Sequence, residues 1–193
     1  MALRVLLIDE EPDQASKLEA LLHDQGHIVL ARLPLSADLL GAVNERQPEI
    51  VVVDIKLPDP GTLRQMRDIT RKHPRPIVMF VDRDDSALIR QAVKAGVSAY
   101  AVGDISASRI KSILDIAMAQ FSETQALRNE LAEVKNTLAE RKIVEQAKGI
   151  IMQQRQCSEA EAYRDLRRTA MDRGAKLAEI ARTVIEASKE VPR

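Results

Sequence analysis

The chain has 193 residues, of which 45% are hydrophobic and only 2% aromatic, and its formal net charge is zero. This length allows one large domain or a mid-sized domain with a small second one, and the core has to be built from aliphatic side chains. No apolar run approaches the roughly 18 residues of a membrane-spanning helix, and acidic residues interrupt the apolar N-terminal run too early for a signal peptide.

The charged residues are distributed unevenly along the chain. Residues 1–108 carry 13 Lys or Arg and 16 Asp or Glu, whereas residues 109–193 carry 16 and 13. The basic excess in the second half favours an anionic partner there. Cys157 is the single cysteine, which excludes an intrachain disulfide and suits a reducing, cytoplasmic environment.

Five short aliphatic runs alternate with helical patterns through the first hundred residues. The runs are predicted strands, in chain order 4–8, 27–30, 50–53, 77–81 and 99–102. Between them apolar residues recur at helical spacing, and Gly26 and Gly96 are placed to end two of these helices. This alternation predicts a flavodoxin-like α/β domain over residues 1–105, with a five-stranded parallel sheet and helices on both faces.

Acidic residues follow two of the predicted strands. Asp9 and Glu10 follow the first strand and Asp54 ends the third, and in an open parallel sheet such strand ends converge on one crevice. Three carboxylates brought together are costly unless a cation or a basic group offsets them, and oxygen ligands of this kind suit Mg²⁺. We therefore expect an acidic pocket at Asp9, Glu10 and Asp54 with Mg²⁺ as its candidate ligand, and no other cofactor.

The segments LLIDE (residues 6–10) and VDIKLP (residues 53–58) resemble the receiver domain of two-component response regulators. The resemblance covers residues 3 to about 118. It implies that Asp54 matches the phosphoryl acceptor of that family and that Asp9 and Glu10 match residues that help to hold Mg²⁺.

Two positions depart from the receiver pattern. The fourth strand ends in Val81 where the family has a hydroxyl side chain, and the fifth strand leads to Gly103 without the usual lysine. A phosphoaspartate would lose one neutral and one charge-assisted hydrogen bond, about 2–4 kcal/mol together. Our interpretation is a pseudo-receiver in which Asp54 is a degenerate acceptor. Lys56 could substitute for the missing lysine, and residual phosphorylation of Asp54 is the alternative.

A single long helix is predicted after the fifth strand. From Ser106 to about Gln154 there is no proline and only one glycine, Gly149. Residues of a seam recur every three or four positions with one slip near Leu127: Ile110, Leu114, Ala117, Phe121, Thr124, Leu127, Leu131, Val134 and Leu138. This heptad-like pattern predicts a coiled coil over residues 106–140 and a homodimer through it, because a helix packing on its own domain would show a shorter stripe.

Three short amphipathic helices are predicted over residues 141–193. Apolar residues at 143, 144, 147, 150 and 151 form one stripe, and Ser158 with Glu161 has the spacing of a capping box that begins the second helix. Gly174 fits the end of that helix, and the third helix is expected over residues 177–188. The spacing of Tyr163, the one aromatic residue of this region, predicts a core position.

The segments QAKGIIM (residues 146–152) and SEAEAYRDLRRTAM (residues 158–171) resemble the ANTAR domain over about residues 139–188. That family is a three-helix RNA-binding module of bacterial transcription antiterminators. Basic residues with few aromatics favour recognition of structured RNA by backbone charge and hairpin shape. The candidate RNA contacts are Arg141, Lys142, Lys148, Arg167, Arg168 and Lys176, with Ala147 and Gly149 as small residues that let RNA approach the backbone. Each basic residue could equally belong to a solvated helix face.

The order of pseudo-receiver, coiled coil and ANTAR domain resembles the antiterminators of amidase and nitrate-assimilation genes, and most closely the nitrate-responsive regulators of the NasT type. The resemblance implies a dimer that binds tandem hairpins in a leader mRNA and prevents a terminator stem from forming. It also implies a cytosolic nitrate- or nitrite-binding sensor protein that sequesters the regulator.

Two other classes of regulator remain open. One is a response regulator with the same RNA output that is driven by phosphorylation of Asp54. The other is a DNA-binding regulator, which the third helix disfavours because Arg182 and Lys189 are its only basic residues. An enzyme is not expected, since the sequence has no Gly-rich phosphate loop and no Cys/His metal spacing.

Overall fold

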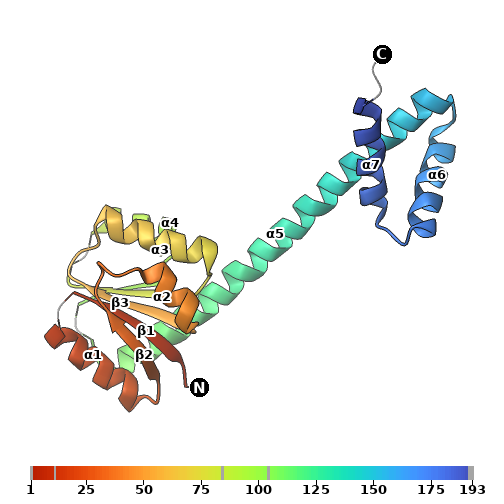
Figure 1. Ribbon diagram of the computed structural model, residues 1–193. Helices are drawn as coiled ribbons and strands as arrows, with labels where there is room; N and C mark the ends of the chain where they lie inside the picture. The colour runs from red at the N-terminus through yellow and green to blue at the C-terminus, as the bar shows by residue number, and fades with distance from the viewer. Residues whose placement is uncertain (1, 11, 84, 104, 191–193) are drawn as a thin grey trace. The chain divides into compact units, whose positions relative to one another are not determined.

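The computed structural model describes residues 2–10, 12–83, 85–103 and 105–190, with side chains except at 12–16, 189 and 190 (Figure 1). The elements are β1 (Arg4–Asp9), α1 (Pro12–Asp24), β2 (Ile28–Leu33), α2 (Leu39–Arg46), β3 (Ile50–Ile55), α3 (Pro60–Lys72), β4 (Ile77–Val81), α4 (Ser86–Ala95), β5 (Ala99–Val102), α5 (Ala107–Arg155), α6 (Glu159–Asp172) and α7 (Leu177–Glu190). The chain divides into two compact units, residues 1–125 and 126–193.

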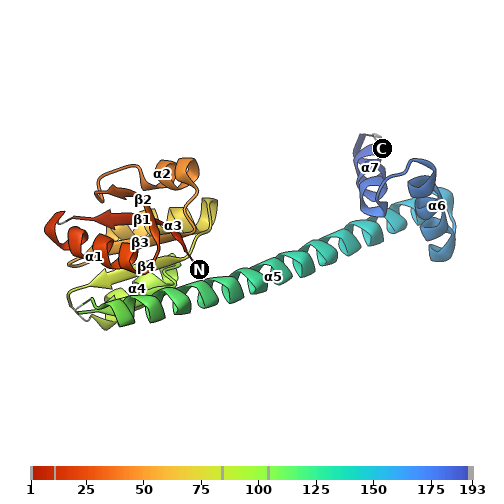
Figure 2. The ribbon, with the colours of Figure 1, turned by 90° about the horizontal axis from the view of Figure 1, so that it is seen from below.

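The first unit contains the predicted five-stranded sheet. Its strand order is β2-β1-β3-β4-β5 and every neighbouring pair is parallel (Figure 2). The expected flavodoxin-like α/β fold is therefore confirmed. The second strand runs to Leu33 rather than ending at residue 30. It was predicted too short because it is a partly exposed edge strand, in which exposed residues such as Arg32 interrupt the apolar run.

Alternate residues of the central strands pack on opposite faces of the sheet. On one face Leu6 and Ile8 of β1 join a buried cluster with residues of α2, α3 and α4. On the other face Val5 and Leu7 join a cluster with α1 and the first part of α5. The middle residues of the central strands β1, β3 and β4 are apolar because helices cover both faces of the sheet.

The helix α5 spans 49 residues, as the predicted long helix requires. The seam residues of its first turns are not available to a second chain. Ile110, Leu114 and Ala117 are at most 2% exposed and pack against the sheet. The stripe in the middle of the helix is different: Leu127, Leu131, Val134 and Leu138 are 50–57% exposed. The nine-residue seam therefore consists of an intramolecular part followed by an exposed part, which we call the stalk stripe (residues 127, 131, 134 and 138).

The second unit is a three-helix module formed by the end of α5 with α6 and α7. Its core is aliphatic and includes Ala147, Ile151, Leu166 and Ala181. The helix α6 ends as predicted, with Gly174 at a φ of +59° and the N–H of residue 175 donating to the carbonyl of residue 170 at 3.0 Å. Glycine adopts this left-handed conformation without the steric strain that a side chain would add.

Candidate nucleic-acid interface and acidic pocket

The acidic pocket forms where the sequence predicted it, at the carboxyl ends of the parallel strands. Asp9 and Asp54 are directly paired in the register of β1 and β3, and each is 7% exposed. Asp54 lines a cavity of about 410 Å³. Its lining comprises Lys17, Leu18, Asp54, Phe80, Val81, Asp82, Gly103 and Ile105.

The two residues that depart from the receiver pattern, Val81 and Gly103, both line this cavity. Val81, at the end of β4, is 2% exposed and supplies only methyl groups, and Gly103 lines the cavity without a side chain. The basic residue that lines the cavity is Lys17, which comes from α1. Lys56 is exposed, and the sequence did not indicate Lys17 as a residue of this pocket.

The three expected magnesium ligands do not come together as a metal site. Glu10 is exposed, whereas Asp9 and Asp54 are buried. Within the described part of the chain, no group of three His, Cys, Asp or Glu side chains is placed to hold a metal ion. Asp9, Glu10 and Asp54 are therefore not arranged as a three-carboxylate Mg²⁺ site among the described residues.

A capping box sets the start of α6. The Ser158 hydroxyl accepts from the Glu161 N–H at 3.4 Å, and the Glu161 carboxylate accepts from the Ser158 N–H at 2.9 Å and from its hydroxyl at 2.7 Å. These hydrogen bonds lower the pKa of Glu161. The predicted start of α6 is thus confirmed. This start sets the positions of the basic side chains along the helix.

Lys148 is an internal clamp of the three-helix module. Its side chain is 8% exposed, and its Nζ atom lies 2.6 Å from a carboxylate oxygen of Glu159 and 2.8 Å from one of Glu145. The same atom is 6.0 Å from the ring centroid of Tyr163. Hydrogen bonding to Glu145, and then to Glu159, raises the pKa of Lys148, and the bond from Lys148 lowers the pKa of Glu159.

The placement of Tyr163 was predicted incorrectly. It is 42% exposed rather than buried. Its neighbour Ala162 fills the core position with 0% exposure, because one residue along a helix turns the side chain by roughly 100°. Its ring instead covers the Lys148 side chain at the surface of the module.

The clamp predicts a specific pH dependence of module stability. The folded-state pKa of Glu159 lies below its ordinary value of 4.5, so its stabilising contribution is present above that pH and is lost as the pH falls through the folded-state pKa. The contribution of Lys148 is complete below its ordinary pKa of 10.5 and is lost as the pH rises through the raised value. We expect the melting temperature of the module to be constant from about pH 6 to about pH 9 and to fall below pH 4.5.

Thermal melts followed by circular dichroism across this pH range would check the prediction. The Glu159→Gln variant should melt at a lower temperature at neutral pH and show a smaller acid-induced fall than the unmodified protein. An equal acid-induced fall in both proteins would contradict this role of Glu159.

The predicted RNA contacts divide into exposed and buried residues. Six are exposed, namely Arg141, Lys142, Gly149, Arg167, Arg168 and Lys176. Ala147 is 0% exposed in the module core and Lys148 is held in the clamp. These two residues are therefore buried in the module and do not form part of its exposed surface.

A groove lined by arginines was not predicted from the sequence. It has a volume of about 480 Å³ and lies between α5, α6 and α7. Its lining comprises Ile151, Gln154, Arg155, Asp165, Leu166, Arg168, Thr169, Arg173, Ile180, Val184, Ala187 and Ser188. We call it the arginine groove. Only a partial signal is present in the sequence, because Arg155 and Arg173 lie at the ends of two consecutive helices and only packing brings them together.

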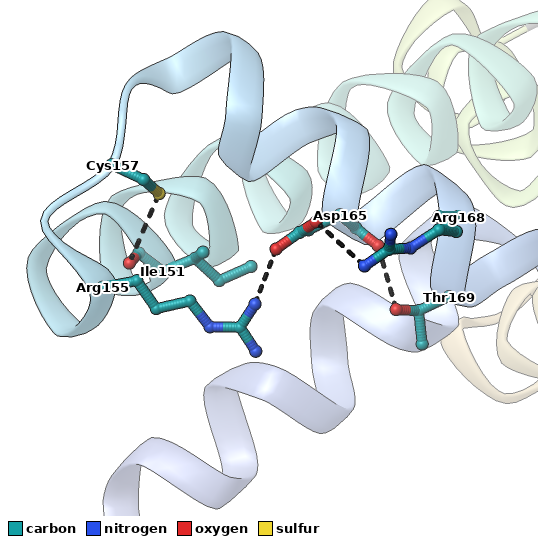
Figure 3. Close-up of polar contacts among 6 residues, drawn as sticks. All are labelled: Ile151, Arg155, Cys157, Asp165, Arg168 and Thr169. Atoms are coloured by element: carbon teal, nitrogen blue, oxygen red, sulfur yellow. Dashed lines mark hydrogen bonds and ion pairs between the residues drawn. The ribbon is translucent and has the colours of Figure 1, made fainter.

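Asp165 organises the rim of the arginine groove. It accepts from Arg155 at 2.6 Å and from Arg168 at 3.4 Å (Figure 3). The Thr169 hydroxyl donates to the backbone carbonyl of Asp165 at 2.9 Å. Within the α5–α6 turn, the Cys157 thiol lies 3.9 Å from the carbonyl oxygen of Ile151. One carboxylate thus holds two guanidinium groups beside the groove.

Comparisons with known proteins place two families along the chain. Residues 5–120 match the response regulator receiver domain, and residues 132–185 match the ANTAR domain. No helix among the described residues combines the length and apolar character needed to span a membrane.

Individual proteins are similar to this chain over all or part of its length. The transcriptional regulatory protein PdtaR of Mycobacterium tuberculosis is 28% identical over 183 residues, covering 95% of this chain and 89% of the relative. A nitrate regulatory protein of Klebsiella oxytoca is 37% identical over 75 residues, covering 39% of this chain and 19% of the relative. A crystal structure of a LuxR-family response regulator from Aurantimonas sp. SI85-9A1 covers 62% of this chain and 86% of its own, with a TM-score of 0.55 and 25% identity.

Proposed function

The chain belongs to the response regulator family, with a receiver domain followed by an ANTAR domain, and we propose that it is a non-enzymatic, RNA-binding transcription antiterminator. In this proposal a dimer holds tandem hairpins of a leader mRNA through its ANTAR modules and prevents a terminator stem from forming. Similarity to a nitrate regulatory protein supports control of nitrate or nitrite assimilation genes.

The observation that carries the proposal is the division of the ANTAR module into an aliphatic core and a basic exterior. The core residues of α6 are Ala162, Leu166 and Ala170, whereas Arg164, Arg167 and Arg168 of the same helix are exposed. Exposed arginines on a rigid helix can bind the phosphates of a folded RNA, which supply most of the affinity of such complexes.

The direct test is a titration of the intact protein against a tandem-hairpin RNA and a duplex DNA of matched length. Binding of the RNA should weaken steeply with added salt, and the duplex should bind at least tenfold more weakly. Equal affinity for the two would favour a DNA-binding regulator instead.

We propose that the receiver domain is controlled by a partner protein and not by phosphorylation of Asp54. The presence of Val81 and Gly103 at the acidic pocket supports this, because a phosphoryl group would find neither a hydroxyl donor nor the usual lysine there. A cytoplasmic sensor protein that binds nitrate or nitrite is the proposed partner.

Incubation with radiolabelled acetyl phosphate should therefore label the protein no more than it labels Asp54→Ala. The RNA affinity of the two proteins should also be equal, since Asp54 lies in the receiver domain and not in the ANTAR module. Labelling that is lost in Asp54→Ala, together with stronger RNA binding by the labelled protein, would establish a phosphorylation switch.

We also propose that the stalk stripe forms a coiled-coil dimer. Its four apolar residues are spaced 4, 3 and 4 apart and are each at least half exposed. Such a stripe on a helix stabilises a second copy of the same helix packed against it. A dimer would provide two modules for two hairpins.

A further inference from the structure

Basic residues are concentrated on two neighbouring helices of the first unit. Residues 1–108 carry 13 Lys or Arg and 16 Asp or Glu, and α3 and α4 together contain six of these basic residues but only one of the acidic ones. The rest of this segment is therefore acidic, with seven basic and 15 acidic residues. We call the solvent side of the two helices the α3–α4 face. Its exposed basic residues are Arg64, Arg67, Arg71, Lys72, Arg90 and Lys94.

The three arginines of α3 form a row along the solvent side of the helix. Arg64, Arg67 and Arg71 lie within about 60° of one another around the helix and span about 10.5 Å of its axis. The opposite side of α3 is buried against the sheet through residues such as Met66 and Ile69. Because this packing fixes the rotation of the helix, the row points to solvent. Such a row suits a polymer with regularly spaced negative charges.

The helix α4 adds two cations beside this row. Both helices pack on the same face of the sheet (Figure 1). Gly96, which caps the end of α4, approaches α3 so closely that a Cβ atom at this position would lie 2.5 Å from the side chain of Thr70. Arg90 and Lys94 are exposed and four residues apart, so they lie on one side of α4. The two helices thus present one continuous basic surface.

The cations of the α3–α4 face have no carboxylate partner among the described residues. None of the six takes part in an ion pair, although Asp68 lies about one turn from both Arg64 and Arg71. Elsewhere in the first unit, Arg4 and Arg32 each have a glutamate oxygen at 3.9 Å. A surface that serves only solubility intersperses both signs of charge. Six cations against a single acid therefore indicate an anionic partner.

We propose that the α3–α4 face binds the phosphate backbone of the RNA that flanks the hairpins. Neither helix has an aromatic side chain on which a base could stack, so the contact is made to phosphates and is independent of sequence. RNA that is held by the ANTAR module of the same chain meets this face at a raised effective concentration, which makes a weak contact effective. This inference rests on the proposed RNA-binding function and adds to it a second RNA contact outside the ANTAR domain.

The test compares two RNAs that carry the same tandem hairpins. One ends at the hairpins, and the other is extended by a duplex stem of about 16 base pairs, the length that a double-stranded RNA-binding module covers. We expect the intact protein to bind the extended RNA about tenfold more tightly at physiological salt, with a salt slope larger by about 3. Fluorescence anisotropy from about 50 mM to about 200 mM salt would measure both quantities.

Two variants with the same change in net charge locate the effect. The first removes the row on α3 through Arg64→Gln, Arg67→Gln and Arg71→Gln. The second makes the same replacement at three exposed cations of the first unit outside α3 and α4, namely Arg4, Arg32 and Lys111. We expect the first variant to bind both RNAs as the unmodified protein binds the short one, and the second variant to keep the tenfold gain. The melting temperature of the first variant should be almost unchanged, because glutamine has a high helix propensity.

Polyglutamate is added as a competitor to distinguish RNA from an acidic protein as the partner. We expect it to compete more weakly than free duplex RNA, because a flexible chain has to be ordered on binding. If polyglutamate removes the gain as effectively as duplex RNA does, the α3–α4 face is a site for an acidic protein and the assignment to RNA is wrong.

The remaining outcomes separate this inference from the function on which it rests. If the extension brings no gain in affinity, or if both variants lose the gain equally, the inference fails while the proposed function stands. If the unmodified protein binds neither RNA, the proposed function itself fails.

Discussion

Replacing Leu131 and Leu138 with glutamine is expected to convert the protein from a dimer to a monomer and to lower its affinity for a tandem-hairpin RNA about a hundredfold. The two leucines are 53% and 54% exposed within a single chain, so their loss does not open a cavity in either compact unit. Glutamine keeps a high helix propensity and adds no charge. The change therefore acts on the packing between two copies of α5.

The affinity for tandem-hairpin RNA is expected to fall because the two hairpins no longer bind to one connected pair of modules. In a dimer, binding of the second hairpin occurs at a high effective concentration, which raises the overall affinity by about 10²–10⁴. The affinity for an isolated single hairpin should change little. Light scattering would give the mass of the variant, and fluorescence anisotropy would give both affinities.

The control for this variant changes the same helix on another side. Ala132→Gln with Ala139→Gln alters two exposed residues that follow the stripe residues by one position, and this protein should remain dimeric. If Leu131→Gln with Leu138→Gln also remains a dimer, the stalk stripe is not the dimer interface.

Replacing Arg167 and Arg168 with glutamine is expected to lower RNA affinity about twentyfold at physiological salt and to reduce the salt slope by about 2. Both side chains are exposed on α6, and only Arg168 has an ion pair among the described residues, a 3.4 Å contact with Asp165. Each bound arginine releases counterions from the RNA, which is why its loss changes the slope. The melting temperature should be almost unchanged.

Lys148→Met is the informative comparison for that variant. Lys148 joins α5 to α6 through Glu159 and is 8% exposed, so methionine should lower the melting temperature of the module while leaving the salt slope unchanged. Measuring binding from about 50 mM to about 200 mM salt would separate the two kinds of residue. A smaller slope in Lys148→Met, with normal stability, would show that Lys148 contacts RNA after all.

The receiver-like sheet and the helical module could be predicted because their signals are local. The apolar runs of the five strands, the capping box at Ser158 and the glycine at 174 each specify structure over a few residues. The pairing of Asp9 with Asp54 also followed, because parallel strands bring their carboxyl ends to one edge. The helix α5 was predictable over its whole length because no proline interrupts it.

The functional surfaces depended on contacts between distant residues. The sequence does not show whether a lysine on a helix faces water or pairs with a glutamate of another helix. Lys148 pairs with Glu159, which is eleven residues away along the chain. The seam residues near Ile110 and those near Leu131 have the same spacing, yet only the first set is covered by the sheet.

The sequence by itself determined the order of elements, the two families and the position of the acidic pocket, because periodicity and short motifs act within one segment. Only the tertiary structure decided which charges and apolar residues are available to a partner. Burial and ion pairing depend on neighbouring elements. Packing buries Lys148 beside Glu159, places Lys17 at the acidic pocket, and brings Arg155, Arg168 and Arg173 together around one groove.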